Sequence, residues 1–138
     1  MSQIFFYTFR TNRFIDDIEV ILGQEVYVID KYSKDFAKLV EAIKLSGASK
    51  VCGIGISKYY TRFEEFTFNK IGKNKIVIDG PEKISLSIPE SKVFNTDTRM
   101  TFGPCNYVVY RLGTETDLEN YFLHIRSKDL SKLKTLEL

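Results

Sequence analysis

A single cysteine at the start of an apolar, helix-length segment is the residue in this sequence best placed to act as a nucleophile. Cys105 follows Gly103 and Pro104, and residues 106–112 are mostly apolar. Proline is tolerated in a first helical turn, and the backbone N–H groups and dipole at that end of a helix favour a thiolate. An unpaired cysteine is more commonly a small buried hydrophobe, so this segment alone leaves both roles open.

The only histidine, His124, follows in a strand-like apolar segment and would share a strand face with Phe122 and Arg126. A cysteine–histidine pair needs the imidazole within hydrogen-bond reach of the sulfur, and usually a third group that orients the ring. Away from such a pair, His124 would be an ordinary hydrogen-bonded histidine of the core or rim. Spacing alone leaves four acids open as the third group: Glu64, Glu65, Asp79 and Asp97.

Hydrophobic patterning predicts the elements that must position these residues. Strands are expected at residues 4–9, 25–29, 50–56, 84–88 and 121–126, with a hairpin formed by residues 63–71 and 75–79. Helices are expected between a Ser33 cap and Gly47, from Cys105 onward, and after Ser127, whereas residues 10–17 read as a loop with a short helical turn. Strand, helix and strand in succession indicate a βαβ unit, and hence an α/β fold whose sheet is at least partly parallel.

Composition sets the class of protein. The 138 residues are 43% hydrophobic and 28% charged, which predicts one folded domain spanning residues 1–138. A formal net charge of +2 gives no argument for a nucleic-acid or membrane partner, and no apolar segment is long enough to cross a bilayer. The N-terminal residues lack the pattern of a secretory signal. Cys52 lies in a buried-strand pattern and Cys105 is far from it in sequence, so we expect two free thiols in a reducing cytoplasm and no metal site.

Three segments resemble the pyroglutamyl peptidases (pyrrolidone-carboxylate peptidases). Residues 105–110 (Cys-Asn-Tyr-Val-Val-Tyr) resemble the family's catalytic-cysteine helix, and residues 122–125 (Phe-Leu-His-Ile) resemble its Phe-Ile-His-Val strand. Residues 53–69 align without gaps to the segment that carries its catalytic Glu and a trailing Asn, here Glu64 and Asn69. The order Glu, Cys, His is also the family's order. The resemblance implies a single three-layer α/β/α sandwich with a mixed, largely parallel sheet.

The resemblance also implies a function. It suggests a cysteine peptidase or amidohydrolase in which Cys105 attacks an N-terminal pyroglutamyl or related amide, His124 moves the proton and Glu64 orients the imidazole. It places Phe9, Phe102 and Asn106 at the substrate, and it implies neither a metal nor an organic cofactor. The partner would then be a peptide or small amide. Family members commonly assemble into oligomers, so the resemblance raises the expectation of a homo-oligomer.

The chain departs from the family around the substrate, and this leaves two alternatives open. Phe9 is kept, but the glycine before it and the second aromatic residue three positions on are absent, and Gly103 stands where the family has an aromatic residue. The chain is also shorter, so one alternative is a catalytically inactive, shortened relative acting as a binding or structural protein. A weaker alternative is a nucleic-acid-binding module that uses interleaved basic and aromatic residues: Lys58, Tyr59, Tyr60 and Arg62, with Lys70, Lys73 and Lys75.

Overall fold

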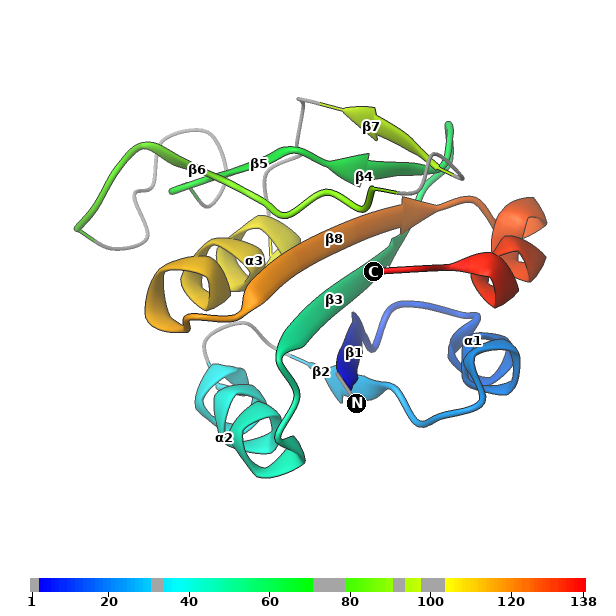
Figure 1. Ribbon diagram of the computed structural model, residues 1–138, viewed down its shortest axis with the longest axis horizontal. Helices are drawn as coiled ribbons and strands as arrows, with labels where there is room; N and C mark the ends of the chain where they lie inside the picture. Colours follow the sequence, from blue (N-terminus) through cyan, green and yellow to red (C-terminus); the bar gives the residue numbers. More distant parts are fainter. Residues whose placement is uncertain (1–2, 31–33, 71–78, 91–93, 98–103) are drawn as a thin grey trace.

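A computed structural model describes residues 3–30, 34–70, 79–90, 94–97 and 104–138 of the chain. Six strands form its main sheet: β1 (Ile4–Phe9), β2 (Tyr27–Ile29), β3 (Lys50–Ile56), β4 (Arg62–Glu64), β7 (Asn95–Asp97) and β8 (Glu119–Ile125). Their order across the sheet is β2-β1-β3-β8-β4-β7 (Figure 1). The first four of these run parallel to one another, whereas β4 pairs antiparallel with β8 and β7 runs parallel to β4. The sheet is therefore mixed and mostly parallel, as expected.

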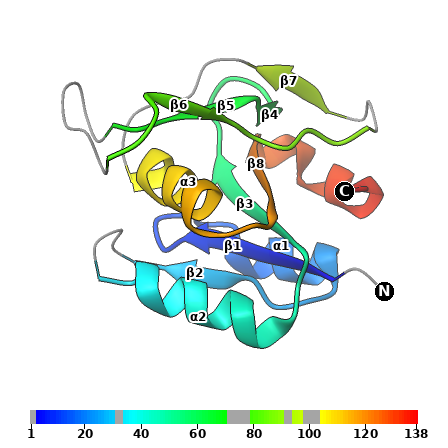
Figure 2. The same cartoon turned by 60° about the vertical axis from the view of Figure 1, so that its left-hand side comes forward.

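Helices cover both faces of this sheet and give the predicted three layers. Helix α1 (Ile15–Leu22) and the 3₁₀ helix η1 (Ser127–Thr135) lie on one face. Helix α2 (Phe36–Ser46) and helix α3 (Pro104–Glu115) lie on the other face, and Figure 1 shows the two pairs on opposite sides of β3 and β8. A second, two-stranded sheet of β5 (Phe66–Phe68) and β6 (Lys83–Ser85) extends over α3 (Figure 2).

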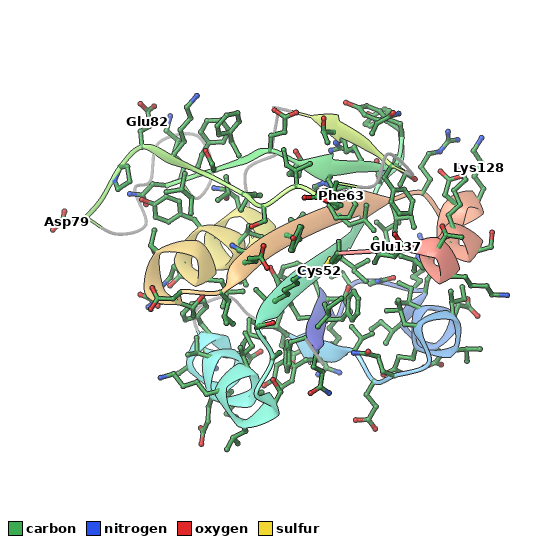
Figure 3. All side chains as sticks on the ribbon, in the orientation of Figure 1. Cys52, Phe63, Asp79, Glu82, Lys128 and Glu137 are labelled. Carbon is green, nitrogen blue, oxygen red and sulfur yellow. The ribbon has the colours of Figure 1, made fainter. Side chains whose placement is uncertain are left out.

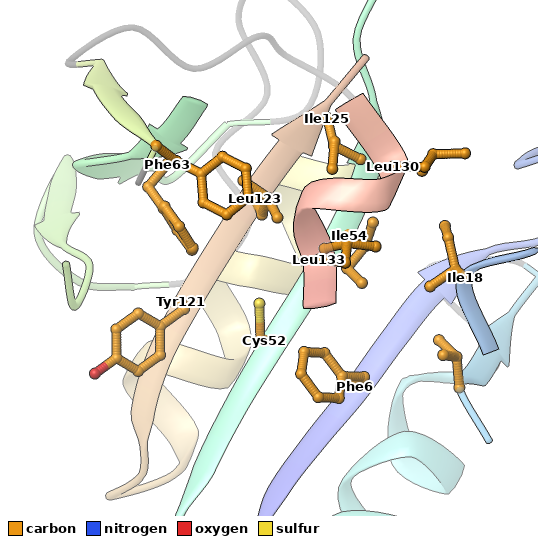
Figure 4. Packing of buried hydrophobic residues seen from close by; sticks show 12 residues of the cluster. Phe6, Ile18, Cys52, Ile54, Phe63, Tyr121, Leu123, Ile125, Leu130 and Leu133 are labelled. Carbon is orange, nitrogen blue, oxygen red and sulfur yellow. The ribbon is translucent and has the colours of Figure 1, made fainter. Parts of the chain in front are cut away.

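Alternating side chains along the central strands build a separate core on each face. Phe6, Cys52 and Leu123 point to the face covered by α1 and η1, where Figure 4 shows them packed together. Adjacent residues on two of these strands, Tyr7 after Phe6 on β1 and Val51 before Cys52 on β3, belong to the core under α2 and α3. This period-two pattern is the ordinary consequence of strand geometry. Because Phe122 lies in the second core, His124 two residues later emerges on the α3 side of β8.

Helix α2 follows its sequence pattern closely. Phe36, Leu39 and Ile43 are buried at helical spacing. The helix is capped at its C-terminus by Gly47, whose φ of 70° lies in the left-handed region that glycine enters without a Cβ penalty. The N-cap is Asp35, and the predicted cap, Ser33, lies outside the described residues.

Two expectations for secondary structure were wrong in detail. Residues 15–22 form helix α1, whereas only a loop with a short helical turn was expected over residues 10–17. The helix is longer because Ile18 is fully buried and Ile21 and Leu22 pack beside it on the same core. The predicted strand 63–71 is divided at Glu65 into β4, which joins the main sheet, and β5, which pairs with β6. Of the predicted strand 75–79, all but Asp79 lies outside the described residues. The predicted C-terminal helix is present as η1.

Candidate active site

The carboxyl ends of three parallel strands, β1, β3 and β8, open onto one cleft of about 730 Å³. Ligands of open α/β sheets commonly bind at this edge, where the loops leaving neighbouring strands separate. Most of the lining comes from the end of β1 and the loop after it, and from the end of β3. The full lining is Thr8, Phe9, Arg10, Thr11, Asn12, Arg13, Phe14, Asp30, Ile54, Gly55, Ile56, Lys58 and His124.

His124 reaches the cleft from the penultimate position of β8. Its side chain is 9% exposed and meets the Phe122 ring edge-on, with the ring centroids 4.9 Å apart. Gly55 on the paired strand β3 leaves room for it: a Cβ at Gly55 would lie 2.9 Å from His124 Cδ2 and 3.2 Å from Nε2. Glycine at position 55 therefore permits a close approach of the histidine to β3.

Glu64 fixes the other side of this imidazole. Its carboxylate is fully buried, and Oε1 lies 2.6 Å from His124 Nδ1. The antiparallel pairing of β4 with β8 sets Arg62 opposite His124 and Phe63 opposite Leu123, so Glu64 is a diagonal neighbour of the histidine on the same face. An ionised carboxylate can only accept a hydrogen bond. Nδ1 is therefore the donor in this contact, and Nε2 is the nitrogen left to act as a base.

Arg62 also contacts the buried carboxylate, a role that the sequence analysis missed. Its Nε lies 3.0 Å from the same Glu64 Oε1, and its side chain is 10% exposed. Its Nη1 donates to Ser57 Oγ at 3.0 Å and to the Tyr60 carbonyl at 3.1 Å. The spacing of Arg62 and Glu64 is the sequence signal for this contact, because residues two apart on a strand share a face. This burial removes Arg62 from the exposed basic surface that the nucleic-acid alternative required.

Of the four acids left open by spacing, Glu64 is the one that the structure brings to the histidine. Asp79 is exposed at the turn before β6, at the far edge of the molecule in Figure 3. Glu65 is half-buried, and its backbone carbonyl accepts a hydrogen bond from Leu86 N. Asp97 pairs in register with Glu64 across β4 and β7, but its side chain lies outside the described part of the chain.

The backbone of Cys105 occupies the first turn of α3, as the sequence predicted. Helix α3 turns directly back into β8 and packs along it, with Asn120 Nδ2 donating to the Val109 carbonyl at 2.9 Å. Glu115 lies ten positions after Cys105 in the helix, a rise of roughly 15 Å. His124 lies five positions after Glu119 in the strand, a rise of roughly 17 Å. Cys105 and His124 are therefore carried to the same edge of the sheet. The side chain of Cys105 and the whole of Phe102 lie outside the described residues.

Asn106, the residue after the cysteine, fastens this helical turn to β5. Its Oδ1 accepts hydrogen bonds from Phe68 N at 2.9 Å and Thr67 Oγ1 at 2.8 Å. Its Nδ2 donates to the carbonyls of Phe68 and Lys70. The amide is fully buried and occupied by the protein itself. A substrate contact from Asn106 stays a prediction, whereas its structural role is to hold the start of α3 beside the segment that follows Glu64.

Phe9 lies where a substrate-contacting aromatic residue was expected. It ends β1, is half-buried, and lines the same cleft as His124. Its ring meets that of Tyr7 edge-on at 6.1 Å between centroids. The position is consistent with the predicted role, which no contact in the structure tests.

Within the described ranges, no three His, Cys, Asp or Glu side chains come together as metal ligands. Over the same ranges, no helix combines the length and apolar character needed to traverse a bilayer.

Solved structures of known enzymes share this fold. Pyroglutamyl peptidase I from Bacillus amyloliquefaciens superimposes with a TM-score of 0.74 at 12% identity, over 98% of this chain and 93% of that chain. Pyrrolidone carboxyl peptidase from Thermus thermophilus gives 0.68 at 12% identity, over 97% and 90%. A single-site mutant of pyrrolidone carboxyl peptidase from Pyrococcus furiosus gives 0.71 at 13% identity, over 98% and 87%. At such identities the similarity establishes an α/β fold of the pyroglutamyl-peptidase type.

No protein-family model matches the chain, and no curated protein matches it.

Proposed function

We propose that this protein is a cysteine hydrolase in which Cys105 is the nucleophile, His124 the general base and Glu64 the acid that orients it. The observation that carries the proposal is the buried 2.6 Å contact between Glu64 and His124 at the inner end of a cleft. A histidine held by a buried carboxylate on one nitrogen, with the other nitrogen available, is the arrangement that a catalytic base requires. The fold shared with pyroglutamyl and pyrrolidone carboxyl peptidases adds support at a coarser level.

Each group has a definite task in this mechanism. The Cys105 thiol gives its proton to His124 Nε2, and the resulting thiolate forms a bond to the carbonyl carbon of the substrate amide. Backbone N–H groups of the first turn of α3 have no partner within the helix, and they face the oxyanion that develops. The C–N bond then breaks as His124 returns the proton to the leaving amine. A water molecule, deprotonated by the same imidazole, hydrolyses the thioester.

The proposed acyl group is an N-terminal pyroglutamyl residue or a related small amide. The cleft next to His124 offers the Phe9 ring and the buried Ile54 for a compact apolar ring, and Thr8 is buried beside them. The neighbours in fold include proteins described as pyroglutamyl and pyrrolidone carboxyl peptidases. Of the two aromatic residues that the resemblance places at the substrate, Phe9 lines this cleft, and Phe102 lies outside the described residues.

The direct test is release of a fluorophore from a pyroglutamyl–aminomethylcoumarin conjugate, compared with alanyl and prolyl conjugates. We expect release from the pyroglutamyl conjugate by the native chain, loss of release in Cys105→Ala, and full release in Cys52→Ala. Release that survives Cys105→Ala would refute the proposal. If a folded native chain releases nothing from any of the three conjugates, the alternative of an inactive relative that acts as a binding or structural protein is favoured.

A further inference from the structure

The charged residues around the cleft are strongly unbalanced. Four charged side chains line it, and three are cations: Arg10, Arg13 and Lys58, against the single acid Asp30. Arg10 and Asp30 form an ion pair with each other. Arg13 and Lys58 are exposed, and among the described residues neither takes part in a hydrogen bond or an ion pair. The mouth of the cleft therefore carries two uncompensated positive charges.

These two cations come from different parts of the chain. Arg13 lies in the loop between β1 and α1, whereas Lys58 lies in the loop after β3. The latter loop is held against β8, because Ser57 N donates to the carbonyl of Ile125 at 2.9 Å, one residue beyond His124. A ligand that enters this cleft toward His124 therefore meets positive charge contributed by two separate loops.

Depth in the cleft separates this charge from the reacting centre. The inner lining residues Thr8, Ile54 and Gly55 are buried, and His124 is 7% exposed. Arg13 and Lys58 stand in solvent at the rim. An acyl group at His124 occupies the inner part of the cleft. The leaving group, on the other side of the scissile bond, therefore extends toward the rim.

We propose that the amides recognised by this site carry a carboxylate on the leaving side of the scissile bond, as in a pyroglutamyl peptide followed by an acidic residue. This inference rests on the proposed function, because it assumes that the acyl group lies at His124. Lys58 and Arg13 bind the carboxylate, and their exposure limits each contribution to about two- to fivefold in affinity. Because both cations stand in solvent, salt weakens the preference.

The test compares two ligands of nearly equal shape and different charge: pyroglutamyl-glutamate and pyroglutamyl-glutamine, each with an amidated C-terminus. Affinities are measured by calorimetry on the Cys105→Ala variant, which removes turnover from the readout. We expect the glutamate ligand to bind about four- to twentyfold more tightly at low salt, and the ratio to fall toward one in 0.5 M salt. Lys58→Gln and Arg13→Gln should each reduce the ratio two- to fivefold.

Lys44→Gln is the matched control. Lys44 is an exposed lysine in the last turn of α2, at the opposite edge of the sheet from the cleft, and its loss should leave the ratio unchanged. Equal affinity for the two ligands, or an equal effect of all three substitutions, would overturn the inference. Tighter binding of a single-stranded oligonucleotide that is also lost in Lys58→Gln would overturn it as well, in favour of a nucleic-acid site.

Failure of the inference and failure of the proposed function give different results. Hydrolysis of both pyroglutamyl dipeptides at equal kcat/KM by the native chain keeps the hydrolase and overturns the charge preference. Preferential binding of the glutamate ligand by Cys105→Ala, with no hydrolysis by the native chain, supports a carboxylate-binding site and refutes the hydrolase function.

Discussion

Replacing Glu64 with Gln removes one negative charge from the interior while leaving the size of the side chain almost unchanged. Glu64 is fully buried, and its Oε1 is shared by His124 Nδ1 at 2.6 Å and Arg62 Nε at 3.0 Å. The substitution therefore leaves the largely buried Arg62 cation without its counter-charge. It also deprives the imidazole of the acceptor that fixes its tautomer.

The size of the effect on stability can be worked from these contacts. At 3.0 Å, two unit charges interact by about 5–6 kcal/mol at an effective dielectric constant near 20. Breaking a buried pair by removing one partner typically costs about 3–5 kcal/mol. Because Arg62 keeps its bonds to Ser57 and to the Tyr60 carbonyl, we expect a loss near the lower end, about 3 kcal/mol. That is a large share of the roughly 5–15 kcal/mol by which folded domains are stable.

Urea unfolding followed by circular dichroism measures this loss, and Glu65→Gln provides the control. Glu65 is the adjacent residue and is half-buried, and the same chemical change there should shift the free energy of unfolding by less than about 0.5 kcal/mol. In the catalytic assay, Glu64→Gln should lower kcat by on the order of 10⁴, the size of loss when an orienting triad acid is neutralised.

A double-mutant cycle with Arg62→Met isolates the interaction itself. Removing both charges leaves no uncompensated ion, so the double variant should be more stable than the sum of the single losses predicts, by about 2 kcal/mol. Strict additivity, or equal losses in Glu64→Gln and Glu65→Gln, would show that the Arg62–Glu64–His124 network does not exist as described.

Three further predictions follow from individual contacts. Gly55→Ala should push the imidazole of His124 out of place and reduce kcat more than stability. Gly53→Ala is the comparison: its Cβ would lie 2.5 Å from the Tyr7 ring and 2.6 Å from Phe122, so it should mainly lower the melting temperature. Asn106→Ala removes the side-chain acceptor of the Phe68 N–H, so urea unfolding should show a loss of about 1–3 kcal/mol. A hydrogen bond from the Thr61 hydroxyl holds the pKa of Asp129 below its ordinary value. The resulting stabilisation is present above that ordinary value and is lost as the pH falls through the lowered pKa, so Asp129→Asn should flatten the acid limb of the stability profile.

The central strands could be predicted from the sequence because each one carries its own signal. Residues 4–9, 50–56 and 121–126 are apolar runs, and such runs are typical of strands covered on both faces. The parallel arrangement followed from the intervening helix α2. Helix α1 was predicted only as a short helical turn because it has eight residues, too few for a clear periodicity beside the polar loop that precedes it.

The candidate site was only partly accessible from the sequence. His124 was a candidate from its residue type, and the resemblance selected Glu64 from four acids. Their contact depends on the register between β4 and β8, which local patterns do not encode. The buried position of Arg62 and the bonds of Asn106 to β5 depend on the division of the strand at Glu65, which the alternation of residues 63–71 concealed. Long-range pairing decided each of these features.

The most direct measurement of the central claim is the rate at which the two cysteines are alkylated. Cys52 is fully buried, and burial raises the pKa of its thiol, so it serves as the slow internal reference. With iodoacetamide at pH 7 and peptide mapping, we predict that Cys105 reacts at least tenfold faster than Cys52. His124→Ala should slow Cys105 while leaving Cys52 unchanged. Equal rates at the two cysteines, or a Cys105 rate that does not respond to His124→Ala, would contradict the account.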